Sequence, residues 1–441
     1  MKNNQKKFHA SRRKELAKLI GKDSIAFIFG NTVINKSFDG NYQFKQFKNF
    51  YYLTGFKEPE AALVIAPNGI KFGKQEKKYN EILYVRPKDK QREIWDGARV
   101  GFENVNKELG INKALENTRI NNLMNIAWLR NFTKVYINFG EMLKLTQKSA
   151  QWVRALIDSL NIIAAHAEVI DISYIMAKLR REKTKEEIEK MKKAAEITIN
   201  SYNKTMKEIK PGVPELKIQA LLEYNYKSEG SEDIAYHPIV ASGENACTLH
   251  YELNNGIMKD GEILTIDSGA EFEYYCCDIT RSFPINGKFT KEQKEIYEIV
   301  LRANKECIKR IKPGVSFNKL SKFSWEILSE GLFKLGILKD KKKIGNYAVH
   351  GLGHHIGLDT HDAVQAEKKL GNNYEILRPG NIITVEPGLY FRNDMKEIPK
   401  KYRGIGIRIE DVVLVTKSGN INLTEKMVKE VRDVEHMMKK D

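Results

Sequence analysis

The sequence predicts a protein of two domains, an N-terminal α/β domain followed by a second domain of mixed helices and strands built from two related halves. Two observations lead to this prediction. Short apolar stretches alternate with polar, helix-like segments over roughly the first 170 residues, and one helix-and-strand pattern occurs twice in the remainder. The length of 441 residues accommodates two or three domains of about 100–200 residues each. We place the border so that the domains are residues 1–175 and 176–441.

The N-terminal domain contains three clear strand candidates. They are the apolar stretches at residues 25–29, 62–65 and 82–85, which are separated by polar sequence of helical character. Alternation of this kind is typical of an α/β domain.

The second domain opens with a long amphipathic helix. Thr184-Lys-Glu-Glu187 is a capping-box pattern, and apolar residues then recur at helical spacing until Pro211-Gly212. The same unit returns at Thr290-Lys-Glu-Gln293, and both copies end in Ile-Lys-Pro-Gly-Val, at residues 209–213 and 311–315. This repetition indicates two halves of similar structure.

A second repeat carries chemistry. Residues 261–272 align without a gap to residues 380–391, with five of twelve positions identical, and Asp267 in the first copy corresponds to Glu386 in the second. Two halves related by a pseudo-twofold would each end a β-branched strand with one carboxylate directed at their shared interface.

Two further carboxylates lie in strand-like sequence downstream of each copy, Asp278 and Glu410. Runs of Ile and Val should be buried, and a buried carboxylate without a partner costs several kcal/mol. Arg281 and Arg408 supply two positive charges at most. Bound metal is therefore the better compensation for four converging acids.

Histidines are concentrated in one glycine-rich stretch. His350, His354, His355 and His361 fall within twelve residues, next to Asp359 and Asp362. The helical zinc motif HExxH does not fit, because Gly351 stands where its Glu is required and the glycines disfavour a helix. We expect a glycine-bent strand or loop that brings several imidazoles to one site. His250 lies seventeen residues before Asp267, near enough to flank that site.

The composition restricts the classes of partner. The net charge is +17, with +12 in residues 1–175 (29 Lys and Arg against 17 Asp and Glu) and +5 in residues 176–441 (45 against 40). Most lysines alternate with acids along predicted helices, which is typical of a solvated face, so we expect no nucleic-acid partner. No apolar window approaches the ~18 residues of a membrane span, and we expect no membrane association. The basic N-terminus does not predict a secretory signal, and four cysteines without a disulfide pattern favour the cytoplasm.

Taken with their spacing, these residues resemble the metal-dependent proline peptidases of the pita-bread fold, and most closely the aminopeptidase P (Xaa-Pro aminopeptidase) family. The resemblance extends over nearly the whole chain. In the first domain, which then corresponds to a creatinase-like N-terminal domain, it rests on residues 50–56 and 93–97. In the second domain it rests on Ile266-Asp267-Ser-Gly-Ala, Asp278-Ile-Thr-Arg281, His350-Gly-Leu-Gly-His354, Thr384-Val-Glu386-Pro-Gly-Leu-Tyr390 and Arg408-Ile-Glu410-Asp411.

The resemblance implies a centre of two divalent metal ions. Mn²⁺ is favoured, and the same residues could also bind Co²⁺ or Zn²⁺. Asp267 would bind one ion, His354 and Glu386 the other, and Asp278 and Glu410 would bridge both. A metal-bridged hydroxide would attack the scissile carbonyl, and Glu386 could carry the proton to the leaving nitrogen. His250 and His361 would hydrogen-bond the substrate, Arg408 would orient the acidic ligands, and His350 and Tyr390 would line the substrate site.

The implied substrate is a peptide with proline in second position. The Xaa-Pro bond is a tertiary amide without an N–H group, so a site that polarises the carbonyl suits it. Two alternatives stay open: a prolidase, which shares the ligands but takes only dipeptides, and a non-catalytic pita-bread binding module. By analogy with the family we expect a homodimer or homotetramer.

Overall fold

The computed structural model describes residues 3–71, 77–119, 127–142, 147–363 and 376–439. The chain forms two compact units, Met1–Leu179 and Arg180–Asp441. The border at residues 175 and 176 that the sequence suggested lies inside α8 (Ser173–Arg181), the helix that contains the junction of the two units. Among the described helices, none is both long and apolar enough to cross a membrane.

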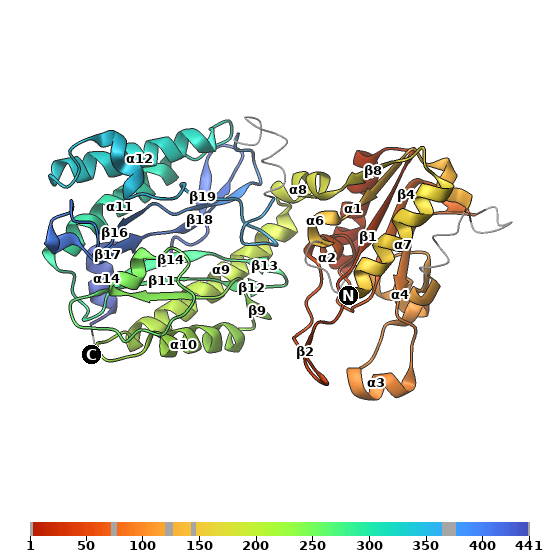
Figure 1. The fold of residues 1–441 in the computed structure, drawn as a ribbon, viewed down its shortest axis with the longest axis horizontal. Helices are drawn as coiled ribbons and strands as arrows, with labels where there is room; N and C mark the ends of the chain where they lie inside the picture. The colour runs from red at the N-terminus through yellow and green to blue at the C-terminus, as the bar shows by residue number, and fades with distance from the viewer. Residues whose placement is uncertain (1–2, 72–76, 120–126, 143–146, 364–375, 440–441) are drawn as a thin grey trace. The chain divides into compact units, whose positions relative to one another are not determined.

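The first unit is built on a six-stranded mixed sheet (Figure 1). Its order is β6-β5-β4-β1-β7-β8, in which β1 pairs antiparallel with β4 and parallel with β7. The three strand candidates are confirmed, because they fall within β1, β4 and β5. The strands are β1 (Ser24–Phe29), β4 (Ala62–Lys71), β5 (Lys78–Val85), β6 (Ala114–Glu116), β7 (Lys134–Ile137) and β8 (Glu168–Asp171).

Apolar side chains from this sheet and from α7 (Gln147–Ile163) form the core of the first unit, including Phe27, Ile82, Val135 and Leu156. This is the layered packing that alternating strands and helices predict. A short hairpin, β2 (Asn35–Ser37) and β3 (Gly40–Asn41), stands apart from the sheet. The remaining helical elements are α1 (Asn3–Ile20), α2 (Lys48–Thr54), α3 (Lys90–Asp96), α4 (Gly101–Leu109), η1 (Asn117–Arg119), η2 (Ala127–Asn131) and α6 (Phe139–Met142).

Two helix pairs frame the second unit, and each pair begins with a complete capping box. In α9 (Lys185–Thr205) the Thr184 side chain accepts from the Glu187 backbone while Glu187 reaches back to Thr184. Thr290 and Gln293 do the same for α11 (Lys291–Arg310), as the sequence predicted. Each is followed by a second helix, α10 (Glu215–Ser228) and α12 (Phe317–Lys334). The α-helix is slightly shorter than the sequence predicted: it ends at Thr205, and the 3-10 helix η3 (Met206–Glu208) follows it.

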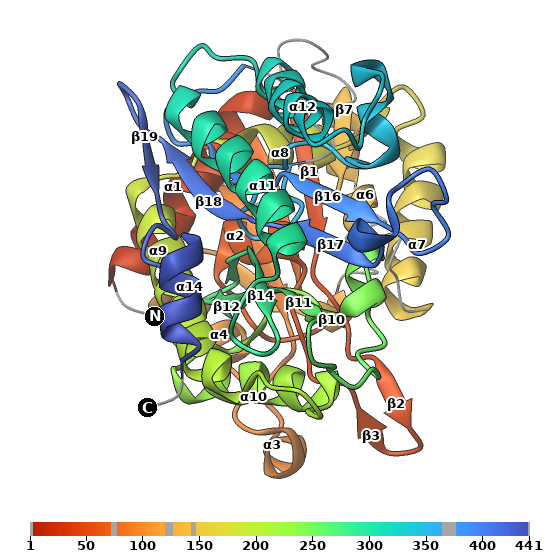
Figure 2. The ribbon, with the colours of Figure 1, turned by 90° about the vertical axis from the view of Figure 1, so that its left-hand side faces the viewer.

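The strands of the second unit lie between these helix pairs (Figures 1 and 2). Each half contributes an antiparallel pair: β11 (Ile263–Ser268) with β14 (Ile279–Pro284), and β15 (Ile382–Val385) with β18 (Asp411–Val415). The order of helix, helix and strand pair is thus the same in both halves, which confirms the internal repeat. The other strands are β9 (Asp233–Ile234), β10 (Ile239–Ser242), β12 (Ala270–Phe272), β13 (Tyr275–Cys276), β16 (Gly388–Phe391), β17 (Ile405–Arg408) and β19 (Asn420–Asn422).

Short helical elements complete this unit. They are η4 (Gly243–Cys247), η5 (Lys341–Asn346), η7 (Lys400–Tyr402) and α14 (Val431–Met437). The four cysteines are free thiols, and Cys276, Cys277 and Cys307 are buried.

Candidate metal centre

The two strand pairs bring four carboxylates together. In the first pair, Asp267 near the end of β11 lies opposite Thr280, two residues after Asp278. In the second pair, Val385 lies opposite Asp411, so Glu386 just after β15 and Glu410 just before β18 stand at the same end. The halves meet there, since the Glu410 backbone N–H donates to the Thr280 carbonyl and the Thr280 hydroxyl to Glu410 Oε2 at 2.7 Å.

Burial makes this arrangement costly unless positive charge is added. Asp278 and Glu410 are almost fully buried, at 4% and 1% exposure, as their apolar surroundings in the sequence indicated. Desolvation and the neighbouring carboxylates, Asp267 for Asp278 and Asp278 for Glu410, raise the pKa of both groups well above the ordinary range. Burial and the charge of Glu410 raise the pKa of Glu386 to about 8.

His354 completes the cluster. One ligand atom from each of Asp278, His354 and Glu410 lies within 4.8 Å of the others. His354 Nε2 is also 3.5 Å from Asp278 Oδ2 and 3.5 Å from Glu386 Oε1. The imidazole is therefore shared between carboxylates of both halves.

The glycine-rich stretch is extended rather than helical, as expected. It runs along β15: the His354 carbonyl accepts from the Thr384 N–H, and the His354 N–H donates to Thr384 Oγ1. A Cβ on Gly353 would lie 2.3 Å from the Thr384 carbonyl oxygen, so only glycine allows this approach. His354 is thus paired with Thr384, the residue two positions before Glu386, and this pairing brings the imidazole close to the Glu386 carboxylate.

Arg408 provides the positive charge inside the site. Its Nη2 donates to Asp267 Oδ2 at 2.6 Å, and its Nη1 donates to the Tyr390 hydroxyl at 2.8 Å. His350 Nε2 lies 2.7 Å from the same hydroxyl. Tyr390 is buried and joins Arg408 to His350, so the structure places these three predicted site residues in one network.

Arg281 occupies a different place. Its guanidinium is fully buried against Asp411 at 2.9 Å and against the Glu410 carbonyl. Lys429 also pairs with Asp411, and these two cations hold the pKa of Asp411 well below its usual range. Arg281 therefore supports the strand that carries Glu410 and does not neutralise the carboxylate cluster.

His361 and His250 reach the same site from two loops. The His361 and His354 rings have centroids 4.1 Å apart in an edge-to-face arrangement. Burial first, and then His354 and His250, lower the pKa of His361 to about 4. Burial, Arg408 and, to a smaller extent, His250 lower the pKa of His350 to about 4. His350 and His361 are therefore neutral near pH 7, and His250 lies close enough to both rings to affect their pKa values.

One residue of the site was not predicted. The hydroxyl of Tyr236 hydrogen-bonds both Asp267 and Asp278. Its position in the sequence, just before His237-Pro238, carries no signal of this contact, which arises only when β10 pairs with β11. Tyr236 holds the two acids of the first half side by side.

The residues present fit divalent metal ions. Four carboxylates and one imidazole converge, with Arg408 as the cation that contacts the cluster, and burial raises the pKa of three of the acids. Such crowding of acids is unfavourable without compensating cations. Oxygen-rich ligation with one histidine suits a hard or borderline divalent ion.

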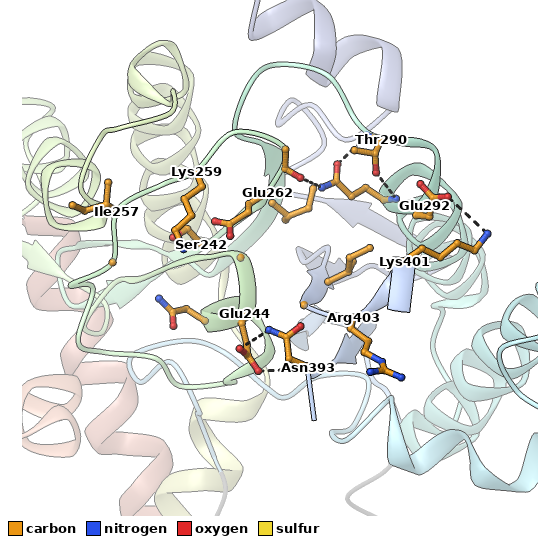
Figure 3. A pocket seen from close by; sticks show the side chains of 18 residues that line it. Ser242, Glu244, Ile257, Lys259, Glu262, Thr290, Glu292, Asn393, Lys401 and Arg403 are labelled. Carbon is orange, nitrogen blue, oxygen red and sulfur yellow. Dashed lines mark hydrogen bonds and ion pairs between the residues drawn. The ribbon is translucent and has the colours of Figure 1, made fainter. Parts of the chain in front are cut away.

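A separate pocket of about 650 Å³ lies at the opposite ends of the same strands (Figure 3). Its lining includes Ile263 and Ile405, which begin β11 and β17, whereas Asp267 and Arg408 lie towards the far ends. Among its described lining residues there is none of the predicted site residues. It mixes acidic and basic side chains, such as Glu262 and Arg403, and does not form part of the carboxylate cluster.

Comparison with known proteins places the chain in a metallopeptidase family. Residues 189–417 match metallopeptidase family M24, so the fold and the site define a metallopeptidase. Residues 9–136 match the aminopeptidase P N-terminal domain.

The similarity extends over most of the length of the relatives. The chain is 36% identical to the Xaa-Pro aminopeptidase of Escherichia coli over 97% of this chain and 96% of that protein. Solved structures of Escherichia coli aminopeptidase P, one with the inhibitor Pro-Leu and one zinc-substituted with product, each have a TM-score of 0.89 at 35% identity and cover 98% of both chains. The chain belongs to the Xaa-Pro aminopeptidase family of metal-dependent peptidases.

Proposed function

We propose that this protein hydrolyses the bond between the N-terminal residue and a proline in second position, Xaa-Pro-Xaa. The observation that carries the proposal is the convergence of Asp267, Asp278, His354, Glu386 and Glu410 at the junction of the two halves. Membership of the Xaa-Pro aminopeptidase family supports the same reaction.

The five residues are proposed to hold two divalent ions. Asp267 would serve one ion, His354 and Glu386 the other, and Asp278 and Glu410 would serve both, in keeping with their central, buried positions. We favour Mn²⁺, while Co²⁺ or Zn²⁺ could use the same donors. When bound, such ions lower the pKa of water and polarise a carbonyl group.

The chain's own residues supply proton transfer and orientation. Glu386 is proposed to accept a proton from the attacking water and deliver it to the proline nitrogen, because its carboxylate lies at the cluster, 3.5 Å from His354 Nε2. Arg408 holds Asp267 in place through its 2.6 Å contact.

The contacts with the substrate are assigned to three further histidines. We assign His250 and His361 to hydrogen bonds with the substrate carbonyl and the tetrahedral intermediate. His350, with Tyr390, lines the position of the proline ring. Because the Xaa-Pro nitrogen has no hydrogen to donate, recognition through the carbonyl and an apolar ring suits this bond.

Assembly and location are part of the proposal. Phe38, Ile94 and Trp95 of the first unit are more than 80% exposed, and large exposed apolar side chains of this kind support a homodimer or homotetramer. Free, buried cysteines support a reducing compartment, which we take to be the cytoplasm. We expect no nucleic-acid or membrane partner; light scattering and a nucleic-acid binding assay check these points.

A comparison of substrates tests the reaction. With Mn²⁺, we expect release of the first residue from an Xaa-Pro-Xaa tripeptide and no cleavage of the matched Xaa-Ala-Xaa control. Cleavage of an Xaa-Pro dipeptide but not the tripeptide would identify a prolidase instead. If metal binds but neither peptide is cleaved, the protein is a non-catalytic binding module.

A further inference from the structure

Glu215 is a fully buried carboxylate outside the metal centre. It is the first residue of α10, and its exposure is 0%. In the part of the chain that the structure describes, no cation forms an ion pair with it. A buried carboxylate without a cation requires several hydrogen bonds to be stable.

Those hydrogen bonds come from one loop. Glu215 Oε1 accepts from the backbone N–H of Ser242 at 2.6 Å, from the Ser242 hydroxyl at 2.6 Å and from Asn245 Nδ2 at 3.1 Å. Oε2 accepts from the Tyr251 hydroxyl at 2.9 Å and from the Gly256 N–H at 2.7 Å. A single side chain therefore holds both ends and the middle of residues 242–256.

The loop carries His250, the residue directly before Tyr251. His250 is exposed, and it interacts electrostatically with His350 and His361. Holding the Tyr251 hydroxyl thus determines where the neighbouring imidazole is presented. On the side of the 650 Å³ pocket the loop has one further support, because Glu244 accepts from the backbone N–H of Asn393 at 3.2 Å and from Asn393 Nδ2 at 2.6 Å (Figure 3).

The two halves of the repeat use the residues at the start of their second helices, α10 and α12, differently. After Ile-Lys-Pro-Gly-Val, the second half continues Ser316-Phe317, and the Ser316 side chain caps its own helix by accepting from Lys319. The first half continues Pro214-Glu215, where Pro214 makes no side-chain cap. Both oxygens of Glu215 serve the loop rather than the helix.

The backbone is also shaped for this carboxylate. A Cβ on Gly256 would come within 2.8 Å of the Glu215 carboxyl atoms. The Glu215 N–H donates to the Gly256 carbonyl at 3.0 Å, so the two residues are bonded in both directions. Glycine at position 256 leaves the space that the carboxylate occupies.

We propose that Glu215 is a positioning residue that holds the 242–256 loop in the shape that presents His250 to the substrate. The inference rests on the proposed function, because it assigns Glu215 an effect through His250. All five hydrogen bonds to Glu215 come from donors, so both of its side-chain oxygens must act as acceptors. An amide at this position would point its NH2 group at some of these donors.

A double-mutant cycle tests the proposal. Glu215→Gln is expected to lower kcat/KM for an Xaa-Pro-Xaa peptide by about 10- to 100-fold, the range typical of groups that orient functional residues. In the His250→Ala background the same substitution should add less than about 2-fold, because the group it positions is gone. Losses that multiply in full would overturn the proposal. Glu208→Gln, an exposed Glu→Gln change that removes only a surface ion pair, is the matched control and should leave kcat/KM unchanged.

Amide hydrogen exchange provides a readout that is independent of activity. In Glu215→Gln, residues 243–256 should exchange faster while α9 keeps its protection; unchanged exchange in the loop would overturn the proposal. If Glu215→Gln does not fold, Tyr251→Phe removes one of the five donors and should give the same pattern with a smaller effect. If the wild type cleaves no Xaa-Pro peptide, the proposed function fails, and exchange still decides whether Glu215 holds the loop.

Discussion

The two halves of the second unit supply their carboxylates from matching elements and their histidines from different ones. Asp267 with Asp278 and Glu386 with Glu410 occupy matching ends of the pairs β11/β14 and β15/β18. The first half then adds the 242–256 loop, whereas the second adds the extended stretch from His350 to His361. The difference teaches that a repeat can supply a symmetric cluster of acids, while the histidines around that cluster come from segments that differ between the halves.

The strongest way to break the comparison is to remove one central carboxylate from each half. Asp278→Asn and Glu410→Gln should each lower kcat by about 10³-fold or more, because each replaces a negatively charged metal ligand of the same cluster with a neutral amide. Circular dichroism should show that both variants remain folded. Retained activity in either variant, with bound metal, would sink the assignment of these acids as shared ligands.

The dependence of stability on pH should differ between the acids of the cluster and the neighbouring Asp411. Burial raises the pKa of Asp278 and Glu410 well above the ordinary range, and that of Glu386 to about 8. The contribution of Glu386 to stability is therefore complete below about pH 4 and is lost as the pH rises through 8, and the contributions of Asp278 and Glu410 are likewise present in acid and lost as the pH rises. Asp411 has the opposite sign, since its lowered pKa contributes stability that is lost in acid.

We therefore expect the Tm of the metal-free protein to fall between about pH 5 and 8 and Mn²⁺ to reverse that fall. Thermal unfolding with and without Mn²⁺ across this range measures it. A metal-free Tm that rises towards pH 8 would contradict the raised pKa values.

The two arginines next to the acids in the sequence, Arg281 and Arg408, have different roles in the structure. Arg408→Lys should lower kcat/KM by about 10- to 100-fold, because a lysine cannot contact Asp267 and Tyr390 together. Arg281→Ala should instead lower the free energy of unfolding by about 3–5 kcal/mol, because it leaves Asp411 buried with one cation fewer. Urea unfolding and peptide kinetics on both variants distinguish the two effects, and equal kinetic losses would refute the distinction.

Removing either capping box should have the smallest effect of these substitutions, and the loss of stability should be equal in the two halves. Thr184→Ala and Thr290→Ala should each lower the free energy of unfolding by about 1 kcal/mol without changing kcat/KM. Serine at either position keeps the hydroxyl and is the control. Unequal losses would show that one cap has a tertiary role that the repeat does not share.

Much of the second unit could be predicted because its signals are local. The capping boxes at Thr184 and Thr290, the carboxylates at strand ends and the non-helical glycine-rich stretch all follow from nearby residues. The contacts of Tyr236, Glu215 and Arg281 could not be predicted, since each joins segments far apart in the sequence. Arg281 stands beside Asp278 in the chain, yet its partner is Asp411, 130 residues away.

The first unit follows the same rule. Its strand candidates at residues 25–29, 62–65 and 82–85 are apolar and buried, and their pattern alone identified them. The order in which they pair, with β1 between β4 and β7, depends on tertiary packing that no local pattern records.

The central claim is that two half-sites together hold a pair of metal ions. Isothermal titration of the metal-free wild-type chain with Mn²⁺ tests it most directly. The account predicts two ions bound per chain, and saturation at one ion or none would contradict it.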